Sequence, residues 1–160
     1  MATIFTAQNP KLLDTKPELV NVTVAAAQTW SRGSLVIITA GAATLCADGD
    51  IPTHIAASDI AAPDTSTLVP LYRLKVGSRL ECYTASNTST AAAVGVANVG
   101  NAYDWALITG SAASAIFHLN LGSNSDKCAL VIDLAANYEP ERNATADSPG
   151  KCIVEVLRVI

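Results

Sequence analysis

The stretch SLVIITAGAATLCA, residues 34–47, predicts a β-hairpin and indicates the fold class of the whole chain. A short apolar run at 34–39 leads into a two-residue turn at Ala40 and Gly41, and the chain returns over 43–47. The Asp-Gly-Asp sequence that follows is typical of a turn and ends the hairpin.

Further short strands are expected on both sides of this hairpin, with Gly, Pro, Asn or Ser at the breaks. Their spacing, roughly 8 to 12 residues, is typical of a β-sandwich or a β-barrel. The clearest strand is 128–134, where Cys128, Leu130, Ile132 and Leu134 are expected to share one face. No segment predicts a helix, and no internal repeat or linker is visible. The other expected strands lie around 22–24 and 54–57, on either side of Gly77, and at 94–99, 105–109, 115–121 and 152–160.

The first twenty residues, MATIFTAQNPKLLDTKPELV, predict an extended arm, because they carry Pro10 and Pro17 and have no sustained apolar period. A chain of 160 residues suits one domain and removes roughly two thirds of its unfolded surface from water. We therefore expect an all-β fold: a single compact β-sandwich or β-barrel-like domain over 21–160 with an extended N-terminal arm over 1–20.

Charged side chains are scarce in the middle of the chain, where Asp104 is the only one between Cys82 and Ser125. Small neutral side chains are buried against a partner at low desolvation cost, which favours a structural assembly protein over a catalyst. The formal charge is −4, and the ten basic residues are scattered singly, so we expect no nucleic acid partner and no membrane partner. No apolar run is long enough to span a bilayer, and the first residues lack a signal-peptide pattern.

The sequence offers few groups for chemistry. His54 and His118 are the only histidines, and neither belongs to a recognisable nucleophile motif. The four cysteines include no Cys-x-x-Cys pair and no close histidine, which argues against zinc. We therefore expect no catalytic residue, no cofactor and no metal, and a protein that is not an enzyme.

Each of the cysteines, Cys46, Cys82, Cys128 and Cys152, lies in an apolar, strand-like stretch, which predicts small buried side chains. Disulfides between neighbouring strands are the alternative. If one forms, Cys128 with Cys152 is the pair to test, because both follow a lysine and open a strand. Antiparallel neighbours would place these two openings at opposite ends, which weighs against that bond.

Between Gln28 and Tyr83 the chain carries QTWSRGSLVIITAGAATLCADG, then IPTHIAASD, then LVPLYRLKVGSRLECYT. A Trp-x-x-Gly turn leads the hairpin, an Ala-rich strand follows, and a strand-Gly-strand segment comes next. This order resembles the small head decoration, or cement, proteins of tailed bacteriophages. The resemblance covers about a third of the chain directly.

The resemblance implies a structural virion protein that is made in the host cytoplasm and added to the outside of an icosahedral capsid. Its implied partners are the major capsid protein and itself, as a homotrimer that bridges neighbouring capsid subunits. Large, neutral and repeated contacts suit such a lattice, and an extended arm adds contacts across a subunit boundary.

The residues expected at the capsid or subunit interface come from the arm, a Gly turn and the strand-Gly-strand segment. The arm residues are apolar without a helical period, which favours docking on a partner over disorder. The Trp is either an interface anchor or the centre of the protein's own core. The two arginines pair with capsid carboxylates or belong to a solvated strand face. These candidates are Ile4, Phe5, Leu12, Leu13, Trp30, Arg73 and Arg79.

A second class of function remains open at this stage. A carbohydrate- or receptor-binding β module of a phage fibre or surface adhesin would bind sugar through exposed aromatic rings. The candidate rings are Trp30, Tyr83, Tyr103 and Trp105.

Overall fold

The computed structural model describes residues 9–60, 64–88, 92, 94–108, 116–134 and 150–159. Within these residues the chain is all-β, as predicted, and no helix is long and apolar enough to cross a membrane. One 3₁₀ turn, η1, accompanies the strands. The elements are β1 (Lys11–Leu12), β2 (Leu19–Val24), β3 (Leu35–Thr39), β4 (Ala42–Leu45), β5 (His54–Ala56), β6 (Leu68–Arg73), β7 (Arg79–Ala85), η1 (Val96–Asn98), β8 (Ala102–Ile108), β9 (Ile116–Asn120), β10 (Ala129–Leu134) and β11 (Lys151–Val156).

The first barrel is a closed ring in the order β2-β4-β3-β5-β6. Its β3–β4 hairpin confirms the prediction made from residues 34–47, since Thr39 pairs with Ala42 across a two-residue turn. Both turn residues have positive φ, 52° at Ala40 and 82° at Gly41, the backbone shape that matches the twist of the flanking strands. Glycine adopts this conformation at no steric cost.

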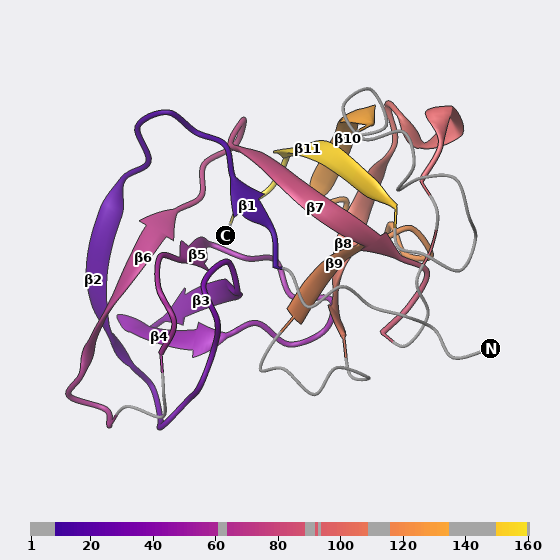
Figure 1. Cartoon of the computed structure of the whole chain (residues 1–160). Coiled ribbons are helices and arrows are strands. Elements are labelled where there is room, and N and C mark those ends of the chain that lie inside the picture. Colours follow the sequence, from indigo (N-terminus) through magenta and orange to yellow (C-terminus); the bar gives the residue numbers. More distant parts are fainter. Residues whose placement is uncertain are drawn as a thin grey trace.

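The second barrel contains β7, β9, β8, β10 and β11 in ring order. A parallel pairing of β7 with β9, through Thr84–Leu119 and Ala85–Asn120, closes the ring. Strand β1 adds to β7 outside this ring, through Lys11–Glu81 and Leu12–Leu80. Figure 1 shows the first barrel on the left, the second on the right, and β1 between them.

The two barrels have the same strand order. In each, the first strand is parallel to the third, and the third–second, second–fourth, fourth–fifth and fifth–first pairs are antiparallel. The first and fifth strands share five residue pairs in each barrel. An equivalent backbone hydrogen bond extends this ladder in both: the Arg73 N–H donates to Glu18 O at 2.9 Å in the first barrel, and the Val156 N–H donates to Ser78 O at 2.8 Å in the second. The structure therefore contains an internal repeat that the sequence did not reveal.

One hydrophobic cluster, the shared core, joins the barrels. It combines Leu35 and Ile55 of the first barrel with Leu80, Trp105 and Phe117 of the second. A smaller cluster around Trp30 fills the first barrel. Because apolar area removed from water is the main stabilising term, a core continuous across both barrels holds them in one compact unit.

The expected arm divides into two parts. Residues 1–8 lie outside the described part of the chain. From Asn9 on, the segment lies against the domain: β1 pairs with β7, the Leu13 N–H donates to Arg79 O at 2.9 Å, and β2 begins at Leu19 as a barrel strand.

Two local predictions were wrong. The 94–99 stretch contains the 3₁₀ turn η1 rather than a strand, because the Asn98 side chain accepts the Gly95 N–H at 2.8 Å and curls the chain between two glycines. In β10 the buried residues are Ala129 and Val131, while Leu130 and Ile132 are half-exposed. A β-bulge between Val131 and Asp133 shifts the register after Val131, so that Leu134 pairs with buried Cys152 and packs against the shared core.

Candidate functional site

A cleft of about 510 Å³ separates β1 and its flanking residues from the first barrel. Its volume lies within the range of ligand-binding pockets. Apolar side chains form most of its walls, and two cationic side chains line it as well. The lining residues are Asn9, Pro10, Lys11, Leu12 and Pro17 on the N-terminal side and Arg32, Gly33, Ile55, Ala56 and Tyr72 on the barrel side.

Asn9 and Gly33 fix the position of the N-terminal segment at the cleft. The Asn9 side chain donates to Ser34 Oγ at 3.3 Å and accepts the Phe117 N–H at 2.9 Å, so it links both barrels. Gly33 has φ +84°, and a Cβ atom there would lie 2.5 Å from Pro10 O. The N-terminal segment therefore packs against a position that only glycine fills without displacement.

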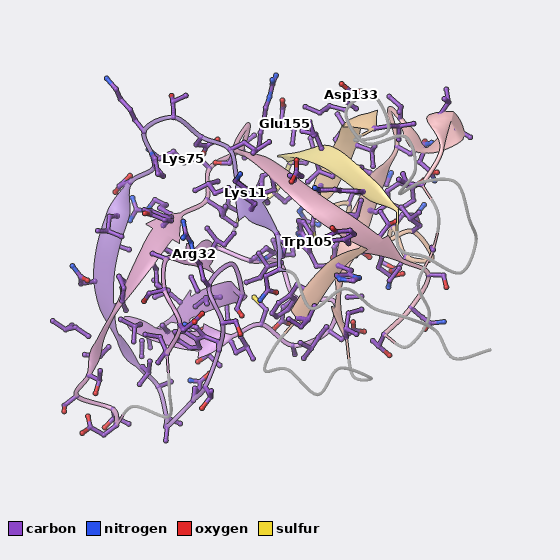
Figure 2. All side chains as sticks on the ribbon, in the orientation of Figure 1. Lys11, Arg32, Lys75, Trp105, Asp133 and Glu155 are labelled. Atoms are coloured by element: carbon purple, nitrogen blue, oxygen red, sulfur yellow. The ribbon has the colours of Figure 1, made fainter. Side chains whose placement is uncertain are left out.

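Lys11 and Arg32 are the two cationic residues that line the cleft. Five of the nine basic residues in the described ranges form ion pairs, namely Arg73, Lys75, Arg79, Lys151 and Arg158. Lys11 and Arg32 have no ion-pair partner in those ranges. Asp59 accepts the backbone N–H of Arg32 at 2.7 Å, not its guanidinium, and Glu81, opposite Lys11 in the ladder, pairs with Lys151 at 3.1 Å. Figure 2 shows Lys11 on β1 and Arg32 across from it, beside the first barrel.

The structure describes two of the four interface residues predicted in the N-terminal segment. Ile4 and Phe5 lie outside the described residues. Leu12 lines the cleft and packs against the shared core, and Leu13 is half-buried next to it. These two leucines therefore contact their own domain rather than extend from it.

Trp30 belongs to the core and is only 1% exposed, so its ring is not available to a partner. It belongs to the hydrophobic cluster of the first barrel, together with residues of the surrounding strands. Arg73 and Arg79 lie on the surface. Arg73 pairs with Glu18 at 3.3 Å, and Arg79 pairs with Glu155 at 3.8 Å. Of the predicted residues that the structure describes, Leu12 and Leu13 therefore lie beside Arg79, whereas Trp30 is buried away from them in the first barrel.

A second hollow, also about 510 Å³, lies beside η1 and is lined by polar groups. Its lining residues are Gly100, Asn101, Ala102, Tyr103, Asn124 and Lys127. Tyr103 is half-buried, and its hydroxyl accepts the Asn98 side-chain N–H at 2.9 Å. The other three aromatic rings considered for sugar binding, Trp30, Tyr83 and Trp105, are at most 3% exposed.

The two histidines lie in different barrels, His54 on β5 and His118 on β9. His54 Nδ1 is 2.7 Å from the Thr53 hydroxyl, which also accepts the Ile38 N–H at 3.1 Å. Burial, and then the positive charge of Arg73, lower the pKa of His54 below its ordinary value, while Glu18 opposes this shift. Both Thr53 and His54 are buried, and the Thr53 hydroxyl links the start of β5 to β3 through the Ile38 N–H.

His118 is fully buried, with its ring centre 5.8 Å from that of Tyr83. No cluster of three or more His, Cys, Asp or Glu side chains suited to a metal ion occurs within the described ranges.

All four cysteines are free and buried, as the sequence predicted. The pair named for a test if a disulfide forms, Cys128 with Cys152, is not the pair that the structure places side by side. Cys82 lies directly opposite Cys152 on β7 and β11, with the sulfur atoms 3.8 Å apart, whereas Cys128 lies 3.9 Å from Asp104 Oδ1. Burial is the main cause that raises the pKa of Cys82 well above its ordinary value and that of Cys128 to about 12.

Sequence reasoning missed Asn9, Lys11 and Arg32. A lone Asn and two scattered cations carry no local pattern, and only the path of the N-terminal segment between the barrels brings them together. Comparison with protein-family models, curated proteins and solved structures finds no match to this chain.

Proposed function

We propose that the protein is a structural virion protein that binds the outer surface of a bacteriophage capsid and stabilises it by bridging neighbouring capsid subunits. The observation that carries this proposal is the pair of like barrels joined by the shared core. A bridge needs two contact regions at a fixed separation, and a rigid body with two lobes supplies them. The motif order of residues 28–83 adds to this argument.

Exposed apolar side chains on each lobe support the proposal. Leu19 and Leu68 on the first barrel are 54% and 61% exposed, and Val96 and Val99 on and beside η1 are 80% and 40% exposed. Burial of such side chains against a partner is favourable at about 25 cal/mol per Å² of apolar area. Repetition over a symmetric lattice strengthens weak individual contacts.

Arg73 and Arg79 contribute to the same proposal. Their ion pairs are exposed, with more than half of each arginine side chain accessible to water, so these pairs contribute little to stability. Each arginine can therefore exchange its own glutamate for a carboxylate of the capsid at little cost. Ile4 and Phe5 are proposed as further contacts of the N-terminal segment. Self-association as a homotrimer and a place on the outer capsid surface belong to this proposal.

Co-sedimentation with undecorated capsids of the phage that encodes the chain tests this function. We expect binding that saturates at a fixed ratio of protein to capsid subunit. The double variants Leu19→Ser/Leu68→Ser and Val96→Ser/Val99→Ser should each weaken binding, and Asn21→Ala, at an exposed polar position of β2, should not. A folded protein that stays in the supernatant at every concentration would overturn the proposal.

The second hollow favours one alternative, a carbohydrate-binding module. Asn101 and Asn124 offer amide groups and Tyr103 offers part of a ring, the side-chain types that bind sugar hydroxyls and sugar faces. The burial of Trp30, Tyr83 and Trp105 weakens this alternative, because no broad aromatic platform remains on the described surface. Glycan-array binding that is lost in Tyr103→Ala would support it over capsid decoration.

A further inference from the structure

We propose that the cleft between β1 and the first barrel binds a short, extended, acidic peptide segment of a partner protein, and that this segment pairs with the free edge of β1. The inference is drawn from the cleft alone and does not rest on the proposed function.

The free edge of β1 follows from the alternation of hydrogen bonds in an antiparallel ladder. The Leu13 N–H donates to Arg79 O at 2.9 Å, and Lys11 and Leu12 pair in register with Glu81 and Leu80. The peptide groups of Lys11 and Leu13 therefore face β7, and those of Leu12 face the opposite side. Within the described ranges, the N–H and C=O of Leu12 have no hydrogen-bond partner. An unpaired strand edge of this kind accepts an added strand.

On the barrel side of the cleft, a bound segment meets side chains and finds no second unpaired strand edge. The first barrel is a closed ring, and the Gly33 N–H at the cleft is already bonded to Ala56 O at 2.9 Å. Tyr72 lines this wall as a half-buried aromatic side chain and is left to contact a side chain of an extended segment. Main-chain pairing therefore occurs only at β1, while the barrel supplies apolar contact.

The charge of the cleft identifies the occupant. Lys11 and Arg32 both line it, and neither has an ion-pair partner in the described part of the chain. Ammonium and guanidinium groups both bind carboxylates, and a guanidinium does so with two parallel hydrogen bonds. A neutral or basic segment would leave both cations without a partner. The volume of about 510 Å³ admits only a few residues.

Two pools of blocked pentapeptides test this inference on the full chain without any capsid. Both pools carry Val, Ile, Leu or Thr at the flanking positions. The central residue is Asp in the first pool and Asn in the second. We expect the Asp pool to shift the amide NMR signals of Leu12 and Gly33 in a saturable way, and the Asn pool to bind about fivefold or more weakly. Hydrogen exchange at the Leu12 N–H should slow when the Asp pool binds.

The variant Lys11→Gln/Arg32→Gln should weaken binding of the Asp pool about tenfold. Lys127→Gln is the matched control, because Lys127 also has no ion-pair partner in the described ranges but lines the second hollow. Both positions of the double variant are exposed, so its amide spectrum should keep the dispersion of the folded protein.

The inference is overturned if the Asp pool gives no saturable shift, if both pools bind equally, or if exchange at Leu12 is unchanged. Peptide binding without capsid co-sedimentation would contradict the proposed function alone. Capsid co-sedimentation without peptide binding would contradict this inference alone.

Discussion

The side-chain oxygen of Asn9 accepts a hydrogen bond from the backbone N–H of Phe117 at 2.9 Å, across 108 residues of sequence. The amide nitrogen of the same side chain donates to Ser34 Oγ at 3.3 Å. One polar side chain at the start of the described chain therefore connects a loop of the first barrel to a strand of the second. The N-terminal segment is a structural part of the domain from this residue on.

Asn9→Ala should destabilise the protein by about 1–2 kcal/mol, because it leaves the Phe117 N–H without its partner in a half-buried position. Urea unfolding measures the change. Asn21→Ala removes the same side chain from an exposed position of β2 and should have little effect. Equal stability of the two variants would show that Asn9 does not hold the barrels together.

Gly33→Ala should cost more than Gly49→Ala, although both glycines have φ near +80°. At Gly49 nothing lies within 4 Å of the added Cβ, so only the left-handed backbone costs energy, about 1–2 kcal/mol. At Gly33 the new Cβ would also lie 2.5 Å from Pro10 O and would displace the N-terminal segment. Thermal unfolding of both variants measures the difference, and a Gly49 variant as unstable as the Gly33 variant would contradict the close packing.

Asp104→Ala should lower the free energy of unfolding by at least about 3 kcal/mol. The buried Asp104 carboxylate accepts the Ser123 hydroxyl at 2.6 Å and the backbone N–H groups of residues 125–127 at 2.9–3.0 Å. Without it, these donors lose their partners. Asp64→Ala is the control, because the Asp64 carboxylate also accepts several bonds within a turn but is exposed, so water replaces them. Comparable losses in guanidinium unfolding would contradict the importance of burial.

The stability of the protein should decrease as the pH falls below about 6.5, the ordinary pKa of histidine. Burial lowers the pKa of His54 in the folded state, so the unfolded chain binds a proton more strongly than the folded one. The contribution of neutral His54 to stability is complete above the pKa that this histidine has in the unfolded chain. It is lost as the pH falls toward the lower pKa that His54 has in the folded protein. Unfolding measured from pH 7.5 to 5 should show a shallower dependence for His54→Gln. The same slope in both proteins would contradict this origin.

The four cysteines should not react with a thiol reagent at pH 8 while the protein is folded, because each is at most 2% exposed. Burial also raises the pKa values of Cys46, Cys82 and Cys128, which disfavours the reactive thiolate. After unfolding in guanidinium, four thiols should react per chain. Stoichiometric labelling of the folded protein would mean that the strands carrying them open readily.

Sequence patterns did not predict the cleft between β1 and the first barrel. Each of its charged residues is a lone cation among neutral neighbours, and the segment over 1–20 was expected to leave the domain. Pairing of β1 with β7 reverses that expectation for Leu12 and Leu13. Which surface an extended segment contacts depends on groups far away in the chain, here Arg79, Phe117 and Ser34.

The sequence by itself determined the local elements of this protein. The turn at Ala40 and Gly41, the strands β3 and β4, the break at Gly77 and the burial of the cysteines follow from short-range preferences that need no distant partner.

Only the tertiary structure decided how those strands close. The same ring order arises twice from strands that share no evident sequence pattern, because order is set by long-range pairing and by apolar area buried in the shared core. The bulge after Val131, the Cys82–Cys152 contact and the cleft lined by Lys11 and Arg32 depend on that pairing, which no single stretch of sequence contains.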